Sequence, residues 1–239
     1  MNETSGEGKK IYAAKRIFIA VAIFFVALLL RWAPDERIPP FDDLYHAKRI
    51  AFSAQHFPRV LDFDRDRGLA GAYCPWPPLY DLTCAVLSHI IDVRWLPPIG
   101  FALFAGLIAL RSGVAGLAMA VAPYLVGISR TSHIDHHWVE PMLMLAIVFA
   151  ARAHRGTLLG IALVAALFVQ PAFIVAAALA FVALYLDGAH RQGFAAFATA
   201  AVAVAGYAAM RPADYPDSAW FLGWPHAAVL IGAAVAFAI

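Results

Sequence analysis

Residues 112–151 read SGVAGLAMAVAPYLVGISRTSHIDHHWVEPMLMLAIVFAA. Two apolar runs, 112–129 and 138–151, lie on either side of a short polar cluster that holds Asp135 and three histidines. Ionisable side chains are costly to place in hydrocarbon, so such a cluster is expected where the chain meets water, a metal or a charged substrate. The stretch therefore predicts membrane-embedded segments with functional residues at the junction between them.

The composition of the whole chain also indicates a membrane protein. Of the 239 residues, 62% are hydrophobic and 14% are charged, and the mean hydropathy is +0.71. A soluble domain would carry about 25% charged residues. The apolar residues come in blocks of membrane or near-membrane length, which predicts an all-α, polytopic bundle of transmembrane helices. The net charge of +2 indicates no particular partner, and nucleic acid is not expected to bind.

Eight apolar segments are predicted to span the membrane, with residues 1–16 as a tail before them and 34–94 as a long first loop. Several segments hold only about 15 apolar residues, where roughly 20 would be usual, and tight packing in a larger bundle would accommodate them. The chain ends within an apolar run, so we expect it to be truncated. The predicted spans are 17–33, 95–111, 113–129, 138–151, 156–170, 172–186, 194–210 and 224–239.

The basic residues predict the orientation of these spans. Lys9, Lys10, Lys15 and Arg16 precede an apolar run that has no small-residue cleavage site, which indicates an uncleaved anchor with its N-terminus inside. Counting spans from there puts three basic turns in the cytoplasm. These turns are at Arg111, 152–155 and 188–191, whereas Arg130 and Arg211 are exceptions on the outer side. The prediction is a multi-pass plasma (inner) membrane protein whose first loop and Asp135 cluster face outward.

The first loop contains most of the remaining polar residues. Asp42 and Asp43 are suited to cap a helix that runs to about His56. The alternating acids of 62–67 lack the glycine and glutamate of a calcium loop, so a solvated turn with internal salt bridges is expected. A surface helix is predicted over 79–91. The two cysteines of the chain, Cys74 and Cys84, would allow a disulfide, although packing is the safer interpretation.

Two short motifs resemble those of a known family. The first is Asp43-Leu44-Tyr45-His46, with Arg49 on the next helical turn. It resembles the first acidic motif of oligosaccharyltransferase catalytic subunits, which are GT-C membrane glycosyltransferases. Their second acidic motif follows the third span, where this chain has residues 132–137, and an external amphipathic helix matches 79–91. The resemblance covers nearly the whole chain, which would correspond to the N-terminal half of such an enzyme. It implies that residues 17–239 form a transmembrane domain of GT-C type.

The resemblance implies glycan transfer from a polyprenyl-(pyro)phosphate-linked donor, embedded among membrane lipids, to an acceptor polypeptide, with asparagine as the expected acceptor. It implies that Asp43 and Asp135 are catalytic and that they hold a divalent cation together with His137, which takes the place of a second acid. Oxygen ligands suit Mg²⁺ or Mn²⁺, and an imidazole shifts the preference toward Mn²⁺. The residues expected to contact the phosphates of the donor are His136, Arg65, Arg67 and Arg130.

Other interpretations of the same residues remain open at this point. His133 and His136 would bind zinc with Asp135, or the histidines would form a solvated turn. A GT-C transferase that modifies lipids or cell-wall glycans is a second function. A transporter or assembly subunit that binds cations without catalysis is a third. The acceptor-recognition motif of the resembled family, Trp-Trp-Asp-Tyr-Gly, is absent from this sequence.

Overall fold

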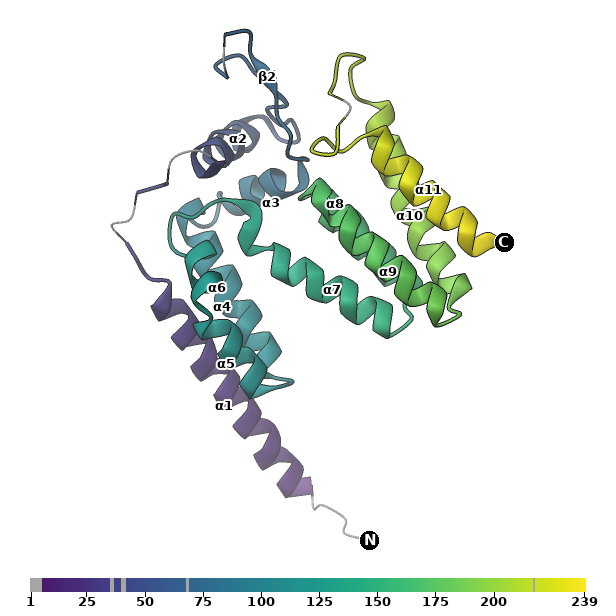
Figure 1. Cartoon of the computed structure of the whole chain (residues 1–239). Helices are drawn as coiled ribbons and strands as arrows, with labels where there is room; N and C mark the ends of the chain where they lie inside the picture. Colours follow the sequence, from purple (N-terminus) through teal and green to yellow (C-terminus); the bar gives the residue numbers. More distant parts are fainter. Residues whose placement is uncertain (1–5, 35–36, 40–41, 68, 217) are drawn as a thin grey trace. The chain divides into compact units, whose positions relative to one another are not determined.

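The computed structural model describes residues 6–34, 37–39, 42–67, 69–216 and 218–239, so residues 1–5 of the expected tail lie outside the described residues. The regular secondary structure of the described chain consists of helices and one short β-hairpin (Figure 1). It divides into two compact units. The first unit comprises Met1–Ala54 and Cys84–Val139, and the second comprises Gln55–Thr83 and Glu140–Ile239. The chain passes from the second unit to the first within α3 (Leu79–Leu87).

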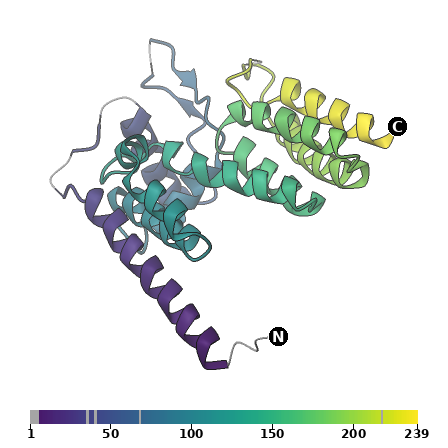
Figure 2. The same ribbon diagram turned by 60° about the horizontal axis from the view of Figure 1, so that its bottom comes forward.

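The first unit is built around α1 (Gly6–Leu30), which packs against α4 (Leu96–Ala109) and α5 (Gly113–Val121) (Figures 1 and 2). Buried alanines occupy their contact, which allows the helix backbones to approach closely. The unit also holds most of α2 (Asp42–His56), the short helices η1 (Val93–Trp95) and η2 (His136–Trp138), and α6 (Pro123–Ile128).

Proline explains where the predicted third span, 113–129, differs from the structure. That segment is two helices, α5 and α6, which meet at Ala122. Pro123 has no backbone N–H to donate, and its ring excludes the helical conformation for the residue before it. Ala122 accordingly has a ψ of 121°. The chain therefore changes direction shortly before the polar cluster.

The second unit contains five longer helices and the hairpin. The helices are α7 (Glu140–Arg152), α8 (Gly156–Leu167), α9 (Ile174–Leu186), α10 (His190–Ala209) and α11 (Trp224–Ala238), with η3 (Pro171–Phe173) before α9. Both α8 and α11 pack against α10 (Figure 2). Strands β1 (Phe63–Asp64) and β2 (Ala72–Tyr73) pair antiparallel, with Phe63 opposite Tyr73.

Helices occur in all eight segments that the sequence predicts to span the membrane, but their lengths support a smaller number of crossings. In the described part of the chain, Lys9–Leu30 and His190–Ala209 are long and apolar enough to cross a membrane. The other apolar helices are shorter, among them Gly156–Leu167 and Trp224–Ala238. Two candidate spans are thus supported by length and composition, and eight spans stay a prediction.

The first loop largely follows its sequence-based description. Helix α2 has the predicted bounds, and α3 begins at Leu79 as predicted but ends at Leu87. The alternating acids differ from the expected solvated turn, because Asp62 precedes β1 and pairs with Arg211, and Asp64 is buried within β1. Asp66 is exposed in the turn that follows. Cys74 and Cys84 are both buried and are not joined by a disulfide, in agreement with the packing interpretation.

Candidate functional site

One face of α2 is polar and buried. Asp43, His46, Arg49 and Ser53 recur at the three- to four-residue spacing of a single helix face, and each is less than a tenth exposed. Buried polar groups are costly unless they find hydrogen-bond or ionic partners. This face of α2 therefore has to meet a polar surface elsewhere in the first unit.

The loop from Ser129 to Asp135 provides that surface, and the end of α1 anchors it. Arg31, which is fully buried, donates from Nε to Ser129 Oγ at 2.6 Å. The backbone N–H of Thr131 donates to the Arg31 carbonyl at 3.1 Å. The Thr131 hydroxyl donates to the same carbonyl at 3.0 Å and accepts from the Ala33 N–H at 3.2 Å. These bonds fix the beginning of the loop against α1.

The middle of the loop is held in an unusual backbone conformation. Ser132 has a φ of 72°, in the left-handed region that residues other than glycine rarely adopt. Its N–H donates to the carbonyl of Arg94 at 3.0 Å. Such a conformation persists only where its surroundings determine it, which the anchors at Thr131 and Arg94 do.

The acidic residue of α2 holds the other end of the loop. Asp43 Oδ1 accepts the backbone N–H of Asp135 at 3.0 Å. One turn along α2, His46 Nε2 lies 3.4 Å from Asp135 Oδ1 and 3.1 Å from His136 Nδ1. The two acidic motifs, about ninety residues apart in the chain, therefore meet in the first unit.

Asp135 is the centre of the cluster. Its Oδ1 accepts the backbone N–H of His136 at 2.6 Å, which caps η2, and lies 2.6 Å from His136 Nδ1. Its Oδ2 lies 3.4 Å from His137 Nε2. Consequently three imidazoles, those of His46, His136 and His137, surround one carboxylate.

The two carboxyl groups differ in their electrostatics. Burial raises the pKa of Asp43, and it outweighs the hydrogen bonds that the carboxyl accepts from the backbone of Asp135 and Ile134. Burial also acts to raise the pKa of Asp135, but the hydrogen bonds and charges of His136 and His46 outweigh it and hold that pKa well below its usual range. Asp135 is thus kept as a carboxylate, the form that binds metal ions.

The geometry of this cluster fits a metal ion. One ligand atom from each of His46, Asp135 and His136 lies within 4.8 Å of the others. Ligands bonded at about 2.1 Å to one ion lie about 3.0–3.4 Å apart in octahedral or tetrahedral geometry. The distances from His46 Nε2 to His136 Nδ1 (3.1 Å) and to Asp135 Oδ1 (3.4 Å) match this range. The 2.6 Å contact from His136 Nδ1 to Asp135 Oδ1 is a hydrogen bond that a metal would replace.

The predicted site residues fall in different parts of the structure. Asp43, Asp135, His136 and His137 come together as described above. Arg130 is half-buried in the same loop and accepts the N–H of His133 on its carbonyl. Arg65 and Arg67 belong to the second unit, on the turn that follows β1, where both are exposed. The guanidinium of Arg67 lies 5.8 Å from the centre of the Trp76 ring. The predicted phosphate contacts of these arginines stay predictions.

Two residues that are central in the structure are not among the predicted site residues. His46 lies three residues after Asp43, which puts it on the same helix face. Arg31 lies at the end of the predicted first span. A buried arginine at the end of an apolar helix is a signal in itself, because such a residue needs several acceptors.

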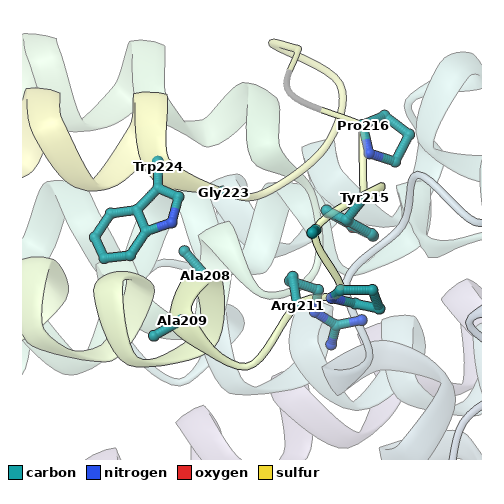
Figure 3. A pocket seen from close by; sticks show the side chains of 9 residues that line it. Ala208, Ala209, Arg211, Tyr215, Pro216, Gly223 and Trp224 are labelled. Atoms are coloured by element: carbon teal, nitrogen blue, oxygen red, sulfur yellow. The ribbon is translucent and has the colours of Figure 1, made fainter.

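A second feature, in the second unit, explains why Arg211 is an exception to the positive-inside rule. A cavity of about 480 Å³ lies where α10 ends and α11 begins, with Arg211, Tyr215 and Trp224 on its wall (Figure 3). Arg211 Nη1 lies 2.9 Å from Asp62 Oδ2, and its guanidinium lies 3.9 Å from the centre of the Tyr207 ring. A cation on the predicted outer side is therefore neutralised by an acid of the first loop.

Solved structures with a similar fold are oligosaccharyltransferases from Archaeoglobus fulgidus. One, a complex with Zn and sulfate, is 19% identical over 92% of this chain with a TM-score of 0.79. A second, of AglB with an inhibitory peptide and a dolichol-phosphate, is 18% identical over 96% of this chain with a TM-score of 0.78. A third, tethered to an acceptor peptide containing the NVT sequon via a disulfide bond, is 18% identical over 93% with a TM-score of 0.78.

These similarities establish that the fold of the chain resembles part of those structures. The chain spans about a third of the length of each, since it covers 34%, 33% and 33% of them. No family model and no curated protein matches the sequence.

Proposed function

We propose that this chain forms the metal-holding transmembrane part of an oligosaccharyltransferase-like GT-C glycosyltransferase. The observation that carries the proposal is the meeting of α2 with the loop before η2, which surrounds the Asp135 carboxylate with imidazoles. The similarity in fold to the archaeal oligosaccharyltransferases supports it. The metal site is proposed for these residues, and glycan transfer is proposed for the enzyme to which they contribute.

The reaction would move a glycan from a polyprenyl-(pyro)phosphate donor to an acceptor, with asparagine of a polypeptide as the favoured choice. The bond from the anomeric carbon to the phosphate oxygen breaks, and the phosphate leaves with the electron pair. A bond from that carbon to the acceptor nitrogen forms, and the proton lost by that nitrogen passes to solvent. A bound divalent cation supplies neutralisation of the negative charge on the leaving phosphate. The similar structures contain a peptide, dolichol-phosphate, sulfate and Zn. Their presence there supports the proposal that this chain contributes to binding a peptide acceptor, a polyprenyl phosphate and a divalent metal.

Each residue of the cluster has a distinct part in this proposal. His46, Asp135 and His136 hold the cation, and His137, whose Nε2 lies 3.4 Å from Asp135 Oδ2, is the next ligand. Asp43, which the resemblance implies is a catalytic residue and a metal ligand, positions the loop by accepting the N–H of Asp135. We propose that its carboxylate also lies near the acceptor. Imidazole nitrogens mixed with a carboxylate favour Mn²⁺ or Zn²⁺ over Mg²⁺, which prefers an all-oxygen set.

The proposed setting is the outer face of the plasma membrane, with eight helical segments embedded and the N-terminus inside. The two long apolar helices support membrane insertion. The basic turns of the sequence support the orientation.

The first test measures metal binding by the full chain purified in a neutral detergent. Mn²⁺ is titrated and the free ion is followed by its electron paramagnetic resonance signal. We expect Asp135→Asn to lower the affinity more than about 100-fold and His46→Gln to lower it at least about tenfold, because each removes a ligand. Asp187→Asn is the matched control, because Asp187 is exposed in the second unit and its loss should change the affinity less than about twofold.

A second step separates the enzyme from the other interpretations. A polyprenyl-pyrophosphate analogue is added with and without Mn²⁺, and we expect binding only with the metal. Metal binding that leaves the analogue unbound would instead indicate a structural zinc site or a cation-binding subunit. If Asp135→Asn and His46→Gln both bind Mn²⁺ like the wild type, the proposed metal site is wrong.

A further inference from the structure

A small cavity of the first unit lies far along α1 from the metal cluster. It encloses about 240 Å³, and the residues that line it come from the N-terminal half of α1 and from the turn between α4 and α5. Lys15, Arg16 and Arg111 carry its charge, with Tyr12 and Gly113 beside them. The structure thus brings together basic residues ninety-five positions apart that the sequence assigns to the same side of the membrane.

Among the residues that the structure describes, no carboxylate neutralises these three cations. No acidic residue lines the cavity, and within the described part of the chain no carboxylate pairs with Lys15, Arg16 or Arg111. The guanidinium of Arg16 lies 5.7 Å from the centre of the Tyr12 ring. The turn itself adds little charge, because the negative C-terminal end of α4 and the positive N-terminal end of α5 meet there and offset each other. Like charges in one concave site attract an anion.

The surface next to the cavity is apolar. Ile11, Ile17 and Phe18 of α1 are 66%, 57% and 73% exposed, and they belong to or adjoin the helix that is long enough to cross a membrane. A soluble anion would gain nothing from this surface. A lipid would place its phosphate among the cations and its acyl chains along the exposed side of α1.

We propose that this cavity binds the phosphate headgroup of an anionic phospholipid. The binding is independent of the metal cluster and of glycan transfer, and it rests only on membrane insertion of α1. Basic cavities between helices on the cytoplasmic side are suited to such headgroups, and each Lys or Arg at an anionic surface strengthens binding by about fivefold.

The probe is a fluorescent phosphatidylglycerol, titrated into the full chain in neutral detergent micelles and followed by anisotropy, with fluorescent phosphatidylcholine for comparison. We expect phosphatidylglycerol to bind at least about fivefold more tightly than phosphatidylcholine, and Arg111→Gln and Lys15→Gln each to weaken it by about fivefold. Arg111→Lys keeps the charge and should bind within about twofold of the wild type. Each variant is first checked for a single symmetrical peak in size-exclusion chromatography.

The control removes as much charge from another basic turn. Arg152→Gln and Arg155→Gln alter exposed cations that are predicted to face the same side but do not line this cavity. Each should weaken phosphatidylglycerol binding by less than about twofold. Equal losses in these controls would overturn the proposal in favour of general surface charge. Displacement of the labelled lipid by millimolar glycerol phosphate or inorganic phosphate would overturn it in favour of a soluble anion.

Discussion

Arg31 illustrates how one side chain links the long apolar helix α1 to the candidate site. It is fully buried, and besides Ser129 it donates from Nη1 to the carbonyls of Ala27 and Ala120, each at 2.9 Å. Its guanidinium lies 4.5 Å from the centre of the Phe101 ring. A single cation therefore joins α1, the end of α5 and the loop that leads to Asp135.

Replacing this arginine should disturb the metal site without removing a ligand. We expect Arg31→Met to lower the Mn²⁺ affinity by about tenfold, because residues that position ligands typically contribute this much. The measurement is the same Mn²⁺ titration as for the ligand variants.

Arg31→Lys provides the comparison for that variant. Lysine keeps the charge but lacks the planar fork that reaches Ser129 and Ala120 together, so its Mn²⁺ affinity should fall between those of the wild type and Arg31→Met. Equal affinities in all three proteins would show that the loop keeps its position without Arg31.

At the scale of elements, the contact between η2 and α4 positions the histidines. Trp138 ends η2 and is buried, and a Cβ built on Gly100 of α4 would lie 2.7 Å from Cη2 of its indole. Only glycine leaves room for this ring. The close approach explains why the helix tolerates a residue of low helix propensity at this point.

The same Gly→Ala change at two positions tests this contact. Gly100→Ala should destabilise the protein by about 1–3 kcal/mol through overpacking against Trp138. Gly127→Ala in α6 meets nothing within 4 Å, and it should be neutral or stabilising by up to about 1 kcal/mol. Thermal unfolding in detergent, followed by tryptophan fluorescence, gives the comparison. Equal shifts in the two variants would mean that Trp138 repacks freely.

In the second unit, two loops are joined by polar contacts. Arg211 pairs with Asp62, and the Tyr73 hydroxyl donates to Asp214 at 2.8 Å, so the hairpin region contacts the α10–α11 loop at two points. The pair is only partly buried, with side chains 15% and 41% exposed. We expect a double-mutant cycle of Arg211→Met and Asp62→Asn to give a coupling of about 0.5–1 kcal/mol in thermal unfolding. A coupling indistinguishable from zero would mean that the Tyr207 ring, and not Asp62, holds Arg211.

At the scale of the whole molecule, the proposed arrangement in the membrane makes a prediction of its own. Single cysteines are introduced at Ala153, in the turn after α7, and at Ala213, in the loop after α10, both of which are exposed. The background is Cys74→Ser, Cys84→Ser, which removes the two native thiols. With the N-terminus inside, a membrane-impermeant maleimide should label Ala213→Cys in intact cells and Ala153→Cys only after permeabilisation. Labelling of both positions from the same side would contradict the predicted number of spans between them.

The sequence alone indicated an all-α chain and the approximate positions of its helices. Blocks of apolar residues, interrupted by proline, glycine and charge, are local signals, and they located a helix in each predicted segment. The acidic residues Asp42 and Asp43 similarly indicated the start of α2. The resemblance carried by Asp43 and by residues 132–137 indicated the fold to which the solved structures are similar.

Only the tertiary structure decided which side chains meet. The contacts from Arg31 to Ser129 and from His46 to His136 join residues 98 and 90 positions apart. Local periodicity can assign a residue to a helix face, but it does not say which distant segment covers that face. Three features bring Asp135 within reach of His46: the helix break at Ala122, the left-handed backbone of Ser132 and the polar face of α2. The set of atoms able to share a metal therefore depends on packing between distant segments, which no short stretch of the sequence encodes.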